Sequence, residues 1–112
     1  MENKLPRQSE LTIIGSDLVI EGKVEVRHEL HLFGKVVGEI RGLEGSTVIL
    51  KEGSLVEGRI LADSLIVDGF VKGDIEAARR VRITSSGTLA GSVKTPALQV
   101  DPGAVFEARV SM

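Results

Sequence analysis

Apolar and polar residues alternate with a period of two between residues 65 and 75. The apolar positions of one parity are Leu65, Val67, Val71 and Ile75. Gly69 and Gly73 lie between them, and the other parity is mostly polar. Such alternation is typical of β-strands that bury one face. Residues 30–40 repeat the arrangement with apolar residues and glycines in the same places. Because one strand cannot bury its own apolar face, the pattern predicts stacked copies.

Four apolar columns of this kind recur in six copies from residue 12 onward. The first column is Thr12, Leu30, Val48, Leu65, Val81 and Leu98, and the second is Ile14, Leu32, Leu50, Val67, Ile83 and Val100. The third is Ile20, Val36, Val56, Val71, Leu89 and Phe106, and the fourth is Val24, Ile40, Ile60, Ile75, Val93 and Val110. Thr12 is the one member without a large apolar side chain. A further column of small residues is expected where neighbouring backbones approach closely, and it consists of Gly22, Gly38, Gly58, Gly73, Gly91 and Ala108.

The length of the repeat selects the fold. Successive members of the first column are 18, 18, 17, 16 and 17 residues apart, which is too short for a helical hairpin and fits one coil of a β-solenoid. The column spacings do not follow the six-residue period of the left-handed coils in hexapeptide acyltransferases. We therefore predict an all-β fold, a single-domain right-handed parallel β-helix of about six coils formed by residues 12–112. Residues 1–11 lack the pattern and are predicted to be a flexible N-terminal tail.

Composition and charge exclude several classes of function. The chain has no cysteine, which excludes disulfides and thiolate sites, and its net charge of −2 argues against a nucleic-acid groove. No stretch approaches the ~20 apolar residues of a membrane span, and the N-terminus lacks the apolar run of a signal peptide, so we expect a cytoplasmic protein. The tail offers one leucine and the cations Lys4 and Arg7, which predicts at most a weak membrane contact through residues 1–11.

Residues suited to catalysis or metal binding are sparse. His28 and His31 are three residues apart, so on a strand they would point to opposite faces, and no cysteine completes a metal site. The acidic residues are scattered, and no glycine-rich phosphate loop precedes a helix. We therefore predict no catalytic residues, no metal, no cofactor and no enzymatic activity. Two alternatives stay open: a left-handed acyltransferase-like enzyme, whose histidine would have to be His28 or His31, and a monomeric solenoid adaptor.

Three segments of the sequence are similar to segments found in a known protein family. They are Val67–Ile75 (VDGFVKGDI), Val56–Ile60 (VEGRI) and the closing Gly103–Met112 (GAVFEARVSM). Together they resemble the bactofilins, bacterial cytoskeletal proteins whose central domain is a right-handed β-helix, and the resemblance covers residues 12–112. Many bactofilins also have long proline-rich flanks and an N-terminal membrane-targeting segment, from which residues 1–11 differ.

The resemblance implies a function as a scaffold. It implies polymerisation without nucleotide into filaments, by stacking of β-helix ends, so the principal partner is the protein itself. It further implies the positioning of cell-wall synthesis or hydrolysis enzymes at the inner face of the cytoplasmic membrane, with effects on cell shape. Finally, it suggests that like ends meet, which gives filaments without polarity.

The two ends of the solenoid are the predicted polymer interfaces. Each terminal coil exposes a cross-section of the core and unpaired strand edges, and the repeat pattern includes no polar capping unit at either end. At the C-terminal end the candidates are Val105, Phe106 and Val110, and Phe106 is the one aromatic residue of the third column. At the N-terminal end the candidates are Ile13, Ile14 and Leu18.

A lateral surface is a further candidate. Several outward-facing positions are apolar and are candidates for bundling or for binding a partner enzyme. The principal ones are Ile49, Ile66 and Phe70, with Phe33, Val37 and Leu55 as further members. Single exposed apolar residues are normal on protein surfaces, so the alternative is an ordinary solvated face.

Overall fold

The computed structural model describes residues 11–111, which contain ten β-strands and no helix. The strands are β1 (Leu11–Ile14), β2 (Val19–Val26), β3 (Glu29–Leu32), β4 (Lys35–Gly42), β5 (Thr47–Leu50), β6 (Leu55–Val67), β7 (Phe70–Ile83), β8 (Thr88–Lys94), β9 (Leu98–Val100) and β10 (Val105–Ser111). The predicted tail lies outside the described residues, except that β1 already begins at Leu11.

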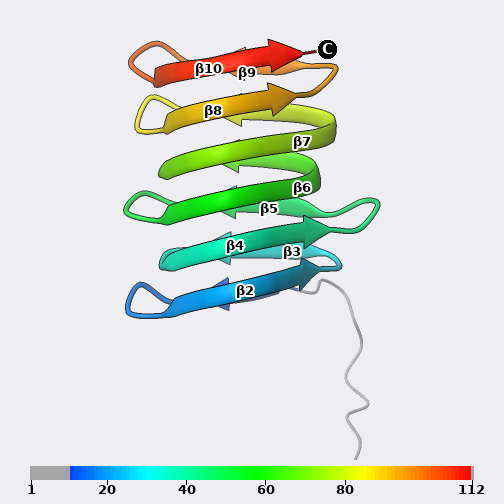
Figure 1. The fold of residues 1–112 in the computed structure, drawn as a ribbon, viewed down its shortest axis with the longest axis vertical. Coiled ribbons are helices and arrows are strands. Elements are labelled where there is room, and N and C mark those ends of the chain that lie inside the picture. Colours follow the sequence, from blue (N-terminus) through cyan, green and yellow to red (C-terminus); the bar gives the residue numbers. More distant parts are fainter. Residues whose placement is uncertain (1–10, 112) are drawn as a thin grey trace, which may run out of the picture.

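The strands wind into a solenoid of six coils (Figure 1). Every strand pairing is parallel and joins equivalent segments of successive coils. In Figure 1 the nearer strands run from left to right, and the more distant strands run back from right to left as the chain rises. This is the course of a right-handed coil. The prediction of an all-β parallel β-helix is therefore confirmed.

The predicted columns are rows of neighbours in register. In the third column Val36 pairs with Val56 and Val56 with Val71, and the other columns pair in the same way. Parallel stacking in register places each side chain on its equivalent in the preceding coil, so the repeat defines the core. Column members in the second to fifth coils are at most 2% exposed, and they are Leu30, Leu32, Val36, Ile40, Val48, Leu50, Val56, Ile60, Leu65, Val67, Val71, Ile75, Val81, Ile83, Leu89 and Val93.

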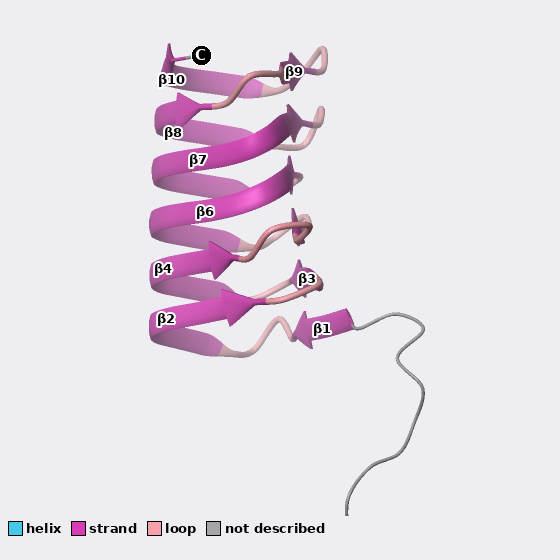
Figure 2. Ribbon diagram, turned by 90° about the vertical axis from the view of Figure 1, so that its right-hand side faces the viewer, coloured by secondary structure: helices cyan, strands magenta, loops and turns pink. Residues whose placement is uncertain are grey.

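A row of glycines crosses the coils between the third and fourth columns. From Gly22 to Gly91 these glycines have φ between 127° and 141°, a region that other residues rarely adopt. A Cβ atom on Gly73 would overlap the carbonyl oxygen of Gly58 in the preceding coil. The strands of this row bend around one edge of the coil (Figure 2), so the row combines a corner with close backbone stacking.

Differences in repeat length are absorbed at the two other corners. Between the second and third columns, Val71 follows Val67 by four residues, whereas Leu89 follows Ile83 by six. At the corner after the fourth column, residues 43–46 form a turn between the second and third coils, and the pairing of β6 with β7 shifts by one residue between Ala62 and Ser64. The buried carboxylate of Asp63 accepts a hydrogen bond from the backbone N–H of Gly45 at 2.8 Å and lies 3.5 Å from Nε of Arg79. These contacts satisfy the one carboxylate that the corner buries, so the core columns stay in register.

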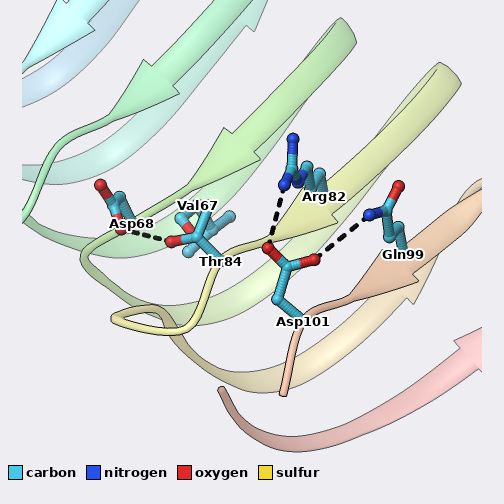
Figure 3. Close-up of polar contacts among 6 residues, drawn as sticks. All are labelled: Val67, Asp68, Arg82, Thr84, Gln99 and Asp101. Atoms are coloured by element: carbon cyan, nitrogen blue, oxygen red, sulfur yellow. Dashed lines mark hydrogen bonds and ion pairs between the residues drawn. The ribbon is translucent and has the colours of Figure 1, made fainter. Parts of the chain in front are cut away.

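Polar side chains also join the last three coils (Figure 3). Thr84 donates a hydrogen bond to the carboxylate of Asp68 in the preceding coil. Nη2 of Arg82 lies 3.1 Å from Oδ2 of Asp101, and Nε2 of Gln99 donates to Oδ1 of Asp101 at 3.2 Å. The charge of Arg82 is therefore matched within the subunit.

Candidate functional site: the two ends of the solenoid

The C-terminal end exposes the last members of the core columns. β10 pairs only with β8 among the described strands, so one backbone edge of β10 has no partner. Phe106 stacks in register on the fully buried Leu89 but is itself only partly buried. Val110 ends the fourth column and is 39% exposed. Val105, the third predicted residue, points outward in register with Thr88 and is 50% exposed.

The N-terminal end differs from the prediction in its details. Ile14 points inward and is buried, so it belongs to the core. Ile13 is 59% exposed, but it points to the side of the coil, in register with His31. Leu18 is exposed in the turn before β2. Of the three candidates, Leu18 and Ile13 therefore border the end, and none forms its apolar centre.

Sequence reasoning missed the residues that form this centre. Ile20 and Val24 of β2 are the first members of the third and fourth columns, and both are only partly buried. Val100 ends the second column at the opposite end and is 41% exposed. The sequence repeat does identify these residues, because the first and the last member of each column have a neighbouring coil on one side only.

Charged residues flank the small residue at the centre of each terminal strand. They are Glu107 and Arg109 around Ala108 in β10, and Glu21 and Lys23 around Gly22 in β2. All four are exposed, and they have the parity opposite to the core columns, so they point outward. Ala108 is the midpoint of β10. Each end thus combines an apolar centre with an acid and a base on either side of its small residue, and β2 carries a further exposed acid, Glu25.

The predicted lateral residues lie on two different sides of the coil. Ile49 and Ile66 are in register on β5 and β6 and are partly buried. Phe70 begins β7 and is in register with Leu55 and Thr88, in another row. A single strip through Ile49, Ile66 and Phe70 is therefore not formed.

Elsewhere in residues 11–111 little supports catalysis. No three histidine, aspartate or glutamate side chains of this range gather closely enough to hold a metal ion. Nε2 of His31 lies 2.6 Å from Oε2 of Glu29, and His28 lies in the turn before β3. Within the same range no helix has the length and apolarity of a membrane span. The ends of the solenoid are therefore the strongest candidate for a functional site.

Known proteins with similar sequences or structures point to one family. The family model for "Bactofilin: Polymer-forming cytoskeletal" matches residues 12–111. Bactofilin BacP of Myxococcus xanthus (strain DK1622) is 30% identical over 101 residues, which cover 90% of this chain and 41% of BacP. Bactofilin BacO of the same organism is 33% identical over 102 residues, which cover 90% of this chain and 79% of BacO. The chain thus spans well under half of BacP and most of BacO.

A solved structure agrees with the sequence matches. It is the cryo-EM reconstruction of Thermus thermophilus bactofilin double helical filaments, with a TM-score of 0.77 and 25% sequence identity. The likeness covers 88% of this chain and 96% of the Thermus chain. The parallel coils, the repeat and these matches agree, and the chain belongs to the bactofilin family of polymer-forming cytoskeletal proteins.

Proposed function

We propose that this chain polymerises end to end, without nucleotide, into filaments. The observation that supports this proposal is the contrast between the middle coils, whose column members are fully buried, and the ends, where Phe106 and Val110 are partly exposed. Stacking two ends buries these side chains and pairs the free strand edges, which favours association. Because each subunit has two such ends, repeated association produces a filament and not a closed pair.

The charges at the ends favour contacts between like ends. If the C-terminal end of one subunit stacked in register on the N-terminal end of the next, Arg109 would face Lys23 of the partner subunit. Glu107 would in turn face Glu21 of the partner subunit. Like charges directly opposite each other on neighbouring strands are destabilising. Head-to-tail stacking in this register is therefore disfavoured.

Antiparallel contact of two C-terminal ends brings opposite charges together instead of like charges. If two β10 strands pair antiparallel with their Ala108 midpoints opposite, Glu107 faces Arg109 of the partner subunit, and the reciprocal pair forms by symmetry. Phe106 then meets Val110 of the partner subunit in the apolar centre. The N-terminal ends behave in the same way, because Glu21 then faces Lys23 of the partner subunit across the Gly22 position. A filament built in this way alternates the direction of its subunits and has no polarity.

Reversal of one charge tests which ends meet. The Arg109→Glu variant is expected to weaken assembly and raise the critical concentration about tenfold, since two cross-strand pairs change from attraction to repulsion at about 0.2–1 kcal/mol each. Head-to-tail stacking predicts the opposite sign, because Glu at position 109 would face Lys23. Within a subunit Arg109 neighbours Ser92, so the change creates no like-charge contact there. Sedimentation at increasing concentration measures the effect, and the double exchange Glu107→Arg with Arg109→Glu should restore assembly.

We further propose that the filament serves as a scaffold for cell-wall and cell-shape machinery on the cytoplasmic side of the membrane. Family membership supports this role, as bactofilins are cytoskeletal proteins. The right-handed course of the coil speaks against the acyltransferase alternative, whose coils are left-handed. Localisation of a fluorescent fusion along the cell envelope tests the role, and diffuse fluorescence throughout the cell would contradict it.

The self-association itself is tested by light scattering. Purified protein without nucleotide should show scattering that rises steeply above a threshold concentration. A monomeric adaptor, the remaining alternative, would scatter in simple proportion to its concentration.

A further inference from the structure

A pocket of about 330 Å³ opens on the side of the solenoid, across the last three coils. The side chains that matter for its chemistry come from successive coils, and they are Ile66, Arg80, Arg82, Ala97 and Gln99. The strand register places them together, because Ile66 pairs with Arg82 and Arg82 with Gln99. Ala97 occupies the position of the sixth coil that corresponds to Arg80 in the fifth, and its short side chain leaves space beside the arginines. We call this hollow the arginine pocket.

The backbone that borders the arginine pocket is fixed by hydrogen bonds. Thr95 is 1% exposed, and its hydroxyl donates a hydrogen bond to the carbonyl oxygen of Ala97 at 3.1 Å. The same carbonyl oxygen accepts a hydrogen bond from the backbone N–H of Val81 in the preceding coil at 2.9 Å. The pocket is therefore already formed in the free subunit, and binding a ligand there requires little ordering of the backbone.

Arg80 gives the pocket a positive charge that the subunit does not match. Arg80 is exposed, and within the described part of the chain its side chain has neither an ion pair nor a hydrogen bond. The neighbouring arginines do have acidic partners. Nη2 of Arg82 lies 3.1 Å from Oδ2 of Asp101 (Figure 3), and Nε of Arg79 lies 3.5 Å from Oδ2 of Asp63. One guanidinium beside the pocket is thus left for a ligand.

We propose that the arginine pocket binds an acidic peptide segment of a partner protein. An aspartate or glutamate carboxylate of the peptide binds Arg80, because the planar guanidinium presents two parallel N–H groups to the two carboxylate oxygens. An apolar side chain next to this acid packs on Ile66 and Ala97, which supply apolar surface in the coils on either side of the arginines. The pocket is complete within one subunit, so this inference does not depend on the proposed filament.

An anionic membrane surface fits this side of the solenoid less well than a peptide does. Attraction to such a surface takes several cations that lie close together. Here the other charged side chains have partners on the same side, since Arg82 is bonded to Asp101 and Nε2 of His31 lies 2.6 Å from Oε2 of Glu29. A single unmatched guanidinium beside a small apolar hollow suits one acidic side chain and its neighbour.

Fluorescence anisotropy with two labelled peptides tests the inference, at protein concentrations below assembly. The acidic probe is Gly-Glu-Glu-Leu-Glu-Glu-Gly, and the basic probe has lysine in place of each glutamate. The wild-type protein should bind the acidic probe and not the basic one. Arg80→Ser, which repeats the Ser64 of the preceding coil, should weaken binding of the acidic probe by at least about tenfold through loss of a charge-assisted hydrogen-bond pair. Arg59→Ser, at an exposed arginine on another side of the coil, is the matched control and should bind as the wild type does.

Two further variants test the charge and the shape of the pocket separately. Arg80→Glu should lose the acidic probe and bind the basic one, because the charge beside the hollow is then reversed. Ala97→Leu keeps both arginines but fills the hollow, and it should also weaken binding of the acidic probe. The circular dichroism spectrum of each variant should keep the β character of the wild type, since both substitutions lie at exposed positions.

Several results would overturn the inference. They are a wild type that binds neither probe or both equally, full binding of the acidic probe by Arg80→Ser or Ala97→Leu, and an equal loss in Arg59→Ser. Binding of phosphatidylglycerol vesicles that is lost in Arg80→Ser, without binding of the acidic probe, would overturn it in favour of a membrane contact. End-to-end assembly, measured separately by sedimentation, would stand in each case.

Discussion

Replacement of Phe106 by arginine is expected to abolish filaments and leave a folded protein. Phe106 lies over Leu89 at the centre of the C-terminal end, where in the proposed contact it meets Val110 of the partner subunit. A guanidinium in this apolar contact would lose its hydration without a matching acid, at a cost of several kcal/mol for each copy. Each contact contains two copies, so assembly should weaken by at least about 100-fold. Sedimentation should then show only small particles of one or two chains.

The fold should tolerate the Phe106 substitution, because only the last coil is involved. The circular dichroism spectrum should keep its β character. Phe70→Arg is the matched control, since Phe70 is an exposed aromatic residue on the side of the fourth coil and not at an end. It should leave filaments unchanged. Filaments of normal length in Phe106→Arg would refute the proposed interface.

Substitution of Gly73 by alanine is expected to cause the largest loss of stability. Its φ of 141° is unfavourable for alanine, and the new Cβ would overlap the carbonyl oxygen of Gly58. The two coils would have to separate in the middle of the stack. We expect the free energy of unfolding to fall by about 3 kcal/mol or more, as for other substitutions that combine backbone strain with steric overlap. Denaturant unfolding followed by circular dichroism, below the concentration of assembly, measures this change.

The Gly22→Ala variant separates the loss of stability due to backbone strain from the loss due to steric overlap. Gly22 belongs to the same row and has a similar φ of 127°, but a Cβ there meets no atom within 4 Å. The free energy of unfolding of this variant should fall only by the cost of backbone strain, on the order of 1 kcal/mol. Equal losses for Gly22→Ala and Gly73→Ala would show that close stacking between coils does not contribute.

The core of this fold was predictable from the sequence because its neighbours are equivalent residues. In a parallel stack in register, Val56 contacts Val36 and Val71, so a repeated column in the sequence is also a row in space. The glycine row was predictable for the same reason. Few other folds translate a sequence repeat so directly into contacts.

The surface was less predictable, because parity distinguishes inside from outside but not one side of the coil from another. Ile66 and Phe70 both point outward, yet a corner lies between them and they face different directions. Ile13 and Ile14 are adjacent in sequence, but one points to the side and the other into the core.

A cryo-EM reconstruction of the filament tests the central claim most directly. We predict rods stacked end on end, with β10 against β10 and β2 against β2 of successive subunits and with Phe106 enclosed at the C-terminal contact. Rods that lie only side by side, with Phe106 and Ile20 left in solvent, would contradict the account.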